Sequence, residues 1–152
     1  MHLMVEMIRS SILSATPVLL AGLGGAYTFH ANVFNIAMEG MMLIGAFTAV
    51  AGSYFSGSWI IGVLSGIAGG LVAALVFAIF VVSLKTDEFV TGTALNMLAL
   101  GGTTYSLRQL FHVKGAFMSH AIQSMPRWNI PLISGIPRVG PILSGHPFIV
   151  YV

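Results

Sequence analysis

Residues 59–84 read WIIGVLSGIAGGLVAALVFAIFVVSL, without one charged side chain. A bilayer core about 30 Å thick is crossed by about 20 apolar residues in a helix, so this run can form one span. The pattern continues on its N-terminal side, because no Asp, Glu, Lys or Arg occurs between Glu39 and Lys85 or between Arg9 and Glu39. Asp or Arg at the membrane centre costs roughly 2.5–3.5 kcal/mol, so long stretches without charged residues indicate segments that cross the membrane. They predict an all-α integral membrane protein, a polytopic bundle of transmembrane helices.

Composition excludes several classes of function. Of the residues, 57% are hydrophobic and 7% are charged, against roughly 45–50% and 25% in an ordinary soluble domain. The net charge of +2 comes from basic residues scattered singly, so no basic patch for nucleic acid is present. The absence of cysteine excludes disulfides and thiol catalysis, and the histidines lack metal-ligand spacing. With no phosphate-binding loop or nucleophile motif, we expect neither an enzyme nor a cofactor bound by this chain.

Four apolar stretches are expected to cross the bilayer as helices. An amphipathic segment, 1–9, precedes them and is expected to lie in the membrane interface. Pro17 is placed in the first turns of the first span, where a missing backbone N–H is tolerated best. The expected spans are 10–29, 41–55, 59–84 and 89–111.

The C-terminal part of the sequence has a different character. Residues 112–147 contain every proline except Pro17 and show no periodicity, which predicts a long loop with a functional role or an ordered cap. A new apolar run, FIVYV, begins at 148 and reaches the last residue at 152. Because a span cannot be completed in that length, we expect the chain to be truncated.

Between the first two expected spans, residues 31–40 read ANVFNIAMEG. The polar residues lie too close to apolar runs for a solvated loop, so we expect a broken or re-entrant segment buried in protein or lining a cavity. Glu39 is the only acid between Glu6 and Asp87, and an intramembrane ionisable residue is by default a functional-site hypothesis. We expect Glu39 to accept hydrogen bonds from backbone N–H groups at the start of the following half-helix. The alternative is a purely structural role, in which Glu39 caps the broken helix or forms a hydrogen bond across the bundle.

Other polar or small residues inside the apolar stretches can be explained by contacts between helices. Asn96 lies in the fourth span among several threonines, including Thr93, and interhelical hydrogen bonding alone would explain them. Three glycines recur every four residues in the third span, on one face of the helix, which favours close packing against another helix. They are Gly62, Gly66 and Gly70. Thr86 is a candidate N-cap of the fourth span.

Residues 33–47, VFNIAMEGMMLIGAF, closely resemble a signature of the ATP-binding-cassette (ABC) importer permeases of the branched-chain amino acid, ribose and nucleoside type. Residues 15–25, 87–101 and 130–145 resemble further motifs of these permeases in the same order and spacing. The resemblance covers nearly the whole chain and is strongest to permeases for nucleosides or simple sugars. Because members of this family are about twice as long, the chain resembles the N-terminal half of such a permease.

The resemblance implies a subunit of an importer in the bacterial plasma membrane. Its implied partners are a second permease subunit, a cytoplasmic ATP-binding subunit, which alone binds ATP, and an extracytoplasmic substrate-binding lipoprotein. It places Asn35, Glu39, Asn96 and Thr93 near the translocation pathway, residues 85–88 on the cytoplasmic side and the long loop outside. Two alternatives remain: a small ion-coupled secondary transporter that uses Glu39 as a proton carrier, and a membrane scaffold that transports nothing.

Overall fold

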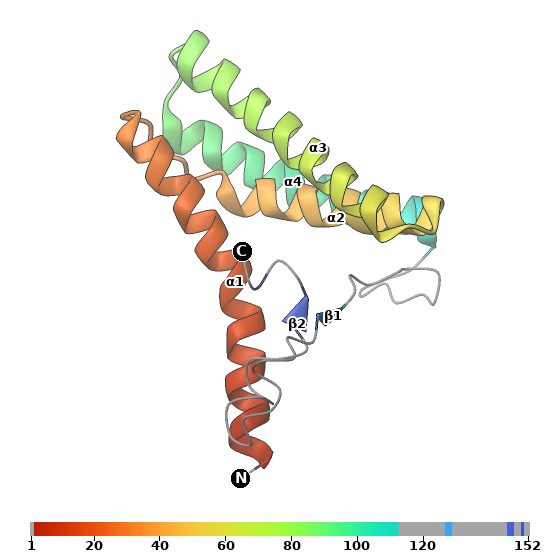
Figure 1. The fold of residues 1–152 in the computed structure, drawn as a ribbon. Coiled ribbons are helices and arrows are strands. Elements are labelled where there is room, and N and C mark those ends of the chain that lie inside the picture. The colour runs from red at the N-terminus through yellow and green to blue at the C-terminus, as the bar shows by residue number, and fades with distance from the viewer. Residues whose placement is uncertain (1, 113–126, 129–145, 148–149, 151–152) are drawn as a thin grey trace. The chain divides into compact units, whose positions relative to one another are not determined.

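The computed structural model describes residues 2–112, 127–128, 146–147 and 150. In these residues it consists of helices and one short antiparallel pair of two-residue strands (Figure 1). The helices are α1 (His2–His30), α2 (Met38–Ser56), α3 (Trp59–Ala78) with its π-helical continuation η1 (Ile79–Ser83), and α4 (Glu88–Phe111); the strands are β1 (Arg127–Trp128) and β2 (His146–Pro147). The prediction of an all-α membrane protein is confirmed, with the strand pair as the one exception among the described residues.

Three of the described helices are long and apolar enough to cross a membrane: Met4–His30, Met38–Ser56 and Trp59–Ser83. α4, which corresponds to the expected fourth span 89–111, is not among them, although it is 24 residues long. Its sequence includes Asn96, Arg108 and several threonines, which lower its hydropathy. Many large apolar side chains of the three spans are exposed, for example Leu19 at 71% and Leu64 at 60%, as expected for surfaces that face lipid.

The N-terminal helix differs from its predicted form. α1 begins at His2 and continues without interruption, so residues 2–9 are not a separate interfacial segment. This stretch contains neither Gly nor Pro, and Leu and Met favour helix, which explains the continuity. Pro17 consequently lies in the middle of α1 and not in its first turns.

Two other helix starts also differ from expectation. α2 begins at Met38, not at 41, which shortens the irregular segment to 31–37. At α4 the N-cap is Asp87, whose carboxylate accepts a hydrogen bond from the Val90 N–H at 3.0 Å. Thr86, the expected cap, lies one residue too early to accept that bond. Most of the expected loop 112–147 and of the expected span start at 148–152 lies outside the described residues.

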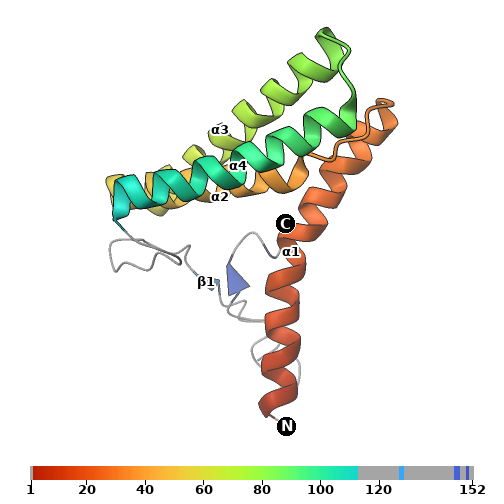
Figure 2. The ribbon, with the colours of Figure 1, turned by 180° about the vertical axis from the view of Figure 1, so that it is seen from behind.

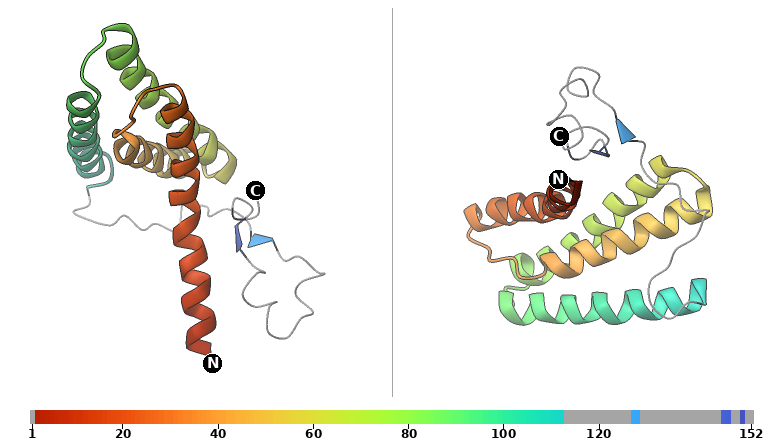
Figure 3. Two further views of the ribbon diagram at one scale, coloured as in Figure 1. Left: turned by 90° about the vertical axis from the view of Figure 1, so that its left-hand side faces the viewer. Right: turned by 90° about the horizontal axis from the view of Figure 1, so that it is seen from below.

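The described residues fall into two units. The first contains α1 as far as Gly24 and the two strands, and the second continues from Gly25 to the end of α4. In the second unit α2 packs against both α3 and α4, and it lies between them when seen from below (Figure 3). Figure 2 shows from behind that α4 runs beside α2. All features described below belong to this second unit.

Small residues bring α2 and α3 together. A Cβ atom added at Gly66 would lie 2.9 Å from the Ala49 Cβ and 3.1 Å from the Gly45 carbonyl oxygen. At Gly62 it would lie 2.9 Å from the Ser53 Cβ, whereas at Gly70 the only atom within reach is the Met41 carbonyl oxygen at 4.0 Å. Of the three predicted glycines, Gly62 and Gly66 therefore lie in close contact with α2, and Gly70 lies in looser contact. The sequence pattern on α3 did not reveal Gly45, its partner on α2.

Aromatic rings join α2 and the segment before it to α4. Phe34 stacks on Phe89 with ring centroids 5.9 Å apart. At the opposite end of the two helices, Tyr54 meets Phe111 edge to face at 5.1 Å. Such pairs contribute roughly 0.5–1.5 kcal/mol beyond their buried area, so they help to keep α4 aligned with α2.

The close approach at Gly66 generates a stability prediction. We expect Gly66→Leu to lower the free energy of unfolding by roughly 1–3 kcal/mol or more, because overpacking forces the two backbones apart. The matched control is Gly101→Leu, because a Cβ at Gly101 meets nothing within 4 Å, while both changes share the gain in helix propensity. Thermal unfolding in detergent and size-exclusion profiles measure the difference. Equal stability of the two variants would show that the α2–α3 contact tolerates a large side chain.

Candidate functional site

The irregular segment between α1 and α2 is a tight reversal of the chain. Ala31 N–H still bonds to the Tyr27 carbonyl oxygen at 3.1 Å, and Val33 N–H bonds to that of Thr28 at 3.0 Å. Asn32 takes a left-handed conformation with φ 61°, which Asn tolerates better than most residues. The segment thus ends α1 within three residues and leads into α2.

Asn35 stabilises the second half of this reversal. Its side-chain Oδ1 accepts a hydrogen bond from the Ala37 N–H at 3.0 Å, and its Nδ2 lies 3.7 Å from the Met41 Sδ. The first contact is a local turn in which the side chain replaces a backbone acceptor. Ala37, at 0% exposure, is fully buried, so its N–H needs this partner.

The start of α2 has no cap of its own, and α4 supplies one. The N-cap residue is Ala37, which has no polar side chain. The Asn96 Oδ1 accepts a hydrogen bond from the Gly40 N–H at 2.7 Å, and the Asn96 Nδ2 donates to the Ile36 carbonyl oxygen at 3.0 Å. The third N–H of a helix is a usual target of an N-cap side chain. Asn96 therefore performs the N-cap role from another helix and holds both sides of the helix start.

Two glycines make this contact possible. A Cβ added at Gly40 would lie 2.7 Å from the Asn96 Oδ1 and 3.0 Å from its Cα. One added at Gly92 would lie 3.0 Å from the Ile36 Cβ and 3.2 Å from the Ala37 nitrogen. Because these neighbours are largely backbone or buried atoms, they could not move aside for a side chain without a loss of stability. The backbones of α2 and α4 therefore approach closely where Asn96 bridges them.

A second link joins the irregular segment to α4. The Glu88 Oε2 accepts a hydrogen bond from the Phe34 N–H at 2.6 Å. Glu88 lies in the first turn of α4, where the positive end of the helix dipole favours a carboxylate. No local sequence pattern shows that Glu88 meets a residue 54 positions earlier.

The structure does not give Glu39 the role that we expected. Glu39 is the second residue of α2 and is exposed, whereas Gly40 is buried against α4. Among the described residues, no hydrogen bond or ion pair of the Glu39 carboxylate is found. The backbone N–H groups near it are instead bonded by Asn35 and Asn96. The prediction that Glu39 caps the following half-helix was wrong.

The remaining predicted pathway residue, Thr93, lies on α4 one turn before Asn96 and is exposed. Its hydroxyl has no partner within the described part of the chain. The structure thus joins Asn35 and Asn96 at the start of α2, and leaves Glu39 and Thr93 exposed. In the described residues no group of three or more His, Asp or Glu could hold a metal ion.

Comparison with known proteins identifies the class of this chain. Residues 7–130 match the family described as the permease component of the branched-chain amino acid transport system. The chain belongs to this permease family. The matched range contains α1 from residue 7 onward, the irregular segment and the whole of α2, α3 and α4, and thus Asn35, Glu39 and Asn96. The resemblance seen in the sequence is therefore confirmed.

Curated relatives in this permease family have related names. The chain is 32% identical over 143 residues to the guanosine ABC transporter permease protein NupQ of Bacillus subtilis. It is 30% identical over 141 residues to the nucleoside ABC transporter permease protein NupC of Lactococcus lactis subsp. cremoris. A putative glucose ABC transporter permease protein, TsgC13 of Haloferax volcanii, is 32% identical over 143 residues.

These alignments cover most of the chain but less than half of each relative. They include 88–89% of this chain and 40–44% of the relatives' lengths. The chain thus spans somewhat less than half the length of the curated permeases that it matches. No solved structure matches it.

The bridge made by Asn96 generates the second prediction. Asn96→Leu keeps the approximate size but leaves the Gly40 N–H and the Ile36 carbonyl oxygen unpaired, at a cost of roughly 1–3 kcal/mol for each. We expect a lower unfolding temperature in detergent and faster hydrogen exchange at the Gly40 amide. Thr93→Val, on the same helix and without a partner to lose among the described residues, is the control and should change neither. Unchanged exchange at Gly40 in Asn96→Leu would show that Asn96 is not needed to hold the start of α2.

Proposed function

We propose that this chain is part of the transmembrane permease of an ABC importer for nucleosides, simple sugars or related small solutes. The observation that carries the proposal is the family match over residues 7–130, which includes most of α1, the irregular segment and the whole of α2, α3 and α4. The names of the relatives support the solute class, since two are nucleoside permeases and one is a putative glucose permease. The chain itself would perform no chemical reaction.

The proposal includes the partners that such an importer requires. These are a second permease subunit, a cytoplasmic ATP-binding subunit and an extracytoplasmic substrate-binding lipoprotein, all in or at the plasma membrane. ATP would be bound by the partner subunit and not by this chain. Energy would then reach the solute pathway through movements of the permease helices, with the irregular segment as part of the path.

The chemistry of the segment fits a pathway for hydroxylated solutes. Irregular backbone at membrane depth is tolerated where it is buried in protein or lines a water-filled cavity. Asn35, Asn96 and Glu88 satisfy backbone groups of the segment, while the Glu39 carboxylate is exposed. A carboxylate left unpaired in hydrocarbon is costly, so Glu39 is expected to face water or a polar solute. Nucleosides and sugars carry several hydroxyl donors, and an ionised carboxylate accepts hydrogen bonds from them.

Two substitutions of Glu39 test this proposal in the importer assembled with its partners. Losing a hydrogen bond to a charged group costs roughly 1.5–3 kcal/mol, so we expect Glu39→Leu to reduce ATP-driven uptake at low solute concentration by about tenfold or more. Glu39→Gln retains shape and an acceptor oxygen and should keep a substantial part of the uptake. Labelled guanosine and glucose are the solutes to measure. Both changes remove the same first-turn charge of α2, so we expect a small and equal effect on thermal stability in the two variants.

The rival functions predict other outcomes. If Glu39 carried protons, Glu39→Gln would be as inactive as Glu39→Leu, and uptake would follow the proton gradient without any ATP-binding subunit. If the chain were a scaffold, both variants would leave uptake unchanged while Asn96→Leu impaired assembly. Either pattern would contradict the proposal.

A further inference from the structure

Two neighbouring residues of α4 hold one residue of the irregular segment between α1 and α2. The Glu88 Oε2 accepts a hydrogen bond from the Phe34 N–H at 2.6 Å, and the Phe89 ring stacks on the Phe34 ring with 19° between the ring planes. The Phe29 ring, near the end of α1, meets the Phe34 ring edge to face with centroids 6.4 Å apart. Phe34 is thus fixed through both its backbone and its side chain, by groups from two helices.

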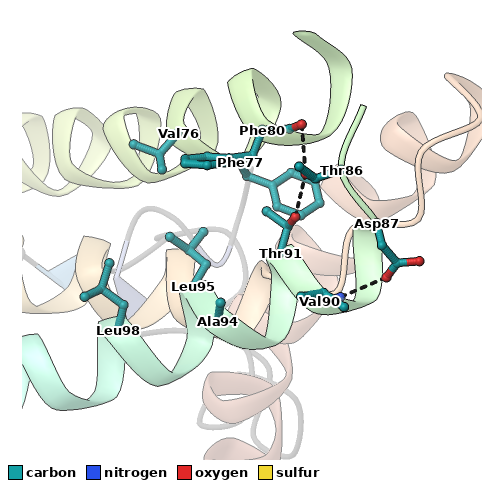
Figure 4. A pocket seen from close by; sticks show the side chains of 10 residues that line it. All are labelled: Val76, Phe77, Phe80, Thr86, Asp87, Val90, Thr91, Ala94, Leu95 and Leu98. Atoms are coloured by element: carbon teal, nitrogen blue, oxygen red, sulfur yellow. Dashed lines mark hydrogen bonds between the residues drawn. The ribbon is translucent and has the colours of Figure 1, made fainter. Parts of the chain in front are cut away.

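The part of the chain that carries Glu88 is itself firmly held. The Phe80 carbonyl oxygen in η1 accepts hydrogen bonds from the Thr86 N–H at 3.1 Å and from the Thr86 hydroxyl at 2.8 Å. The Thr86 and Thr91 hydroxyl oxygens lie 2.8 Å apart, and the Asp87 carboxylate caps α4 (Figure 4). Glu88 therefore follows a connection that is bonded both to η1 and to the first turns of α4.

The link between Glu88 and Phe34 differs from a chance approach of two surface groups. Glu88 is half-buried, whereas Lys85 and Asp87 just before it are exposed. A hydrogen bond from a backbone N–H to an ionised carboxylate is charge-assisted and roughly twice as strong as a neutral one. The stacked rings beside this hydrogen bond restrict the same residue a second time. The contact is therefore suited to keep Phe34 in one place.

The fixed residue lies directly before the turn that leads into α2. The Asn35 Oδ1 accepts a hydrogen bond from the Ala37 N–H at 3.0 Å, and α2 begins at the next residue. Asn96 holds the far side of this turn and the start of α2. The segment thus has two supports from α4, Glu88 before the turn and Asn96 after it. Because a segment held at two points cannot rotate freely about either, its side chains keep one direction.

We propose that Glu88 is a positioning residue of the solute pathway. It holds the irregular segment in one conformation, so that the segment and Glu39, the second residue of α2, face the pathway together. In this role Glu88 acts through Phe34 and does not bind the solute itself. The inference rests on the proposed function, in which Glu39 faces the solute, but the effect of Glu88 on the segment can be measured without transport.

Hydrogen exchange of backbone amides in lipid nanodiscs tests the effect on the segment. Because a hydrogen bond to a charged group is lost, we expect Glu88→Ala to raise exchange at the Phe34 amide about tenfold. If Glu88 positions the segment, exchange at the Ala37 amide rises as well, since the Asn35 turn loses its support. Exchange at the Gly40 amide, which α4 holds independently of Glu88, should stay unchanged. Faster exchange at Phe34 alone would overturn the proposal, because the contact would then be purely local.

Two control variants separate the hydrogen bond from the charge. Glu88→Gln retains an acceptor oxygen at the same reach and should keep these amides as slow as in the parent chain. Asp87→Asn removes the neighbouring negative charge but keeps a favoured N-cap side chain, so it should leave them unchanged too. Should Glu88→Ala fail to fold, as judged by thermal unfolding, Glu88→Ser takes its place, because its side chain is shorter. Exchange as fast in Asp87→Asn as in Glu88→Ala would contradict the proposal, since charge alone would then order the segment.

Uptake by the importer assembled with its partners tests the consequence for the solute. A displaced segment presents the pathway groups less well, so we expect Glu88→Ala to raise the KM for labelled guanosine by up to about tenfold, with little change in the maximal rate. Glu88→Gln should restore the parental KM. An unchanged KM in Glu88→Ala would overturn the positioning role. An importer without any uptake of the tested solutes would contradict the proposed function, and the exchange measurement would still decide whether Glu88 orders the segment.

A cross-link that replaces the contact distinguishes positioning from direct binding of the solute. The chain contains no cysteine, so thiols can be introduced at chosen sites. Phe34→Cys with Phe89→Cys, joined by a short thiol cross-linker, should restore the low KM in Glu88→Ala. The matched control is Tyr54→Cys with Phe111→Cys, at the opposite end of α2 and α4, which should restore nothing. No rescue by the first pair would show that Glu88 acts on the solute directly, and equal rescue by both pairs would show a general effect on stability; either result would overturn the proposal.

Discussion

The Asn96 side-chain amide is the interaction on which the arrangement of the second unit depends. It bonds at once to the Ile36 carbonyl oxygen and the Gly40 N–H, which stand on either side of the start of α2. A helix start has several N–H groups without intrahelical partners, and because Gly40 is buried against α4, its N–H needs a partner from the protein. Because Ala37 has no capping side chain, α2 can begin at Met38 only while α4 lies against it. The position of α4 and the start of α2 therefore depend on each other.

The contacts around this bridge follow from the lipid environment. Apolar side chains gain little by leaving lipid for protein, so helix association relies on close van der Waals packing and on hydrogen bonds. Accordingly, glycines lie where the backbones approach closely: Gly40 and Gly92 between α2 and α4, and Gly62 and Gly66 between α3 and α2. Few residues are fully buried, and they are mostly small or lie beside the bridge, such as Ala37 and Ala99. Small residues thus determine where the helices meet.

Much of the fold was predictable because its causes are local. Long runs without charge predicted α1, α2 and α3, and the polar stretch before α2 predicted an interruption of the helices. What the sequence missed at the candidate site depended on contacts between distant positions. The cap of α2 comes from Asn96, 56 residues after Gly40, and the bond from the Phe34 N–H ends on Glu88. A sequence shows that Asn96 and Glu39 are polar, but only tertiary contact decides which of them bonds to the backbone.

Among the described residues, Glu39 takes no part in holding the backbone at the start of α2. Successive residues of a helix are rotated by about 100°, so when Gly40 turns toward α4, Glu39 is directed away from that contact. Two of the nearby polar groups are bonded to the backbone: Asn96 holds the start of α2, and Glu88 holds Phe34 in the irregular segment. Neither can bind a solute without releasing these backbone groups. The Glu39 carboxylate forms no hydrogen bond to the backbone among the described residues, and Glu39 is exposed. If Glu39 lines a solute pathway, as we propose, its carboxylate could bind a solute while Asn96 keeps the start of α2 in place.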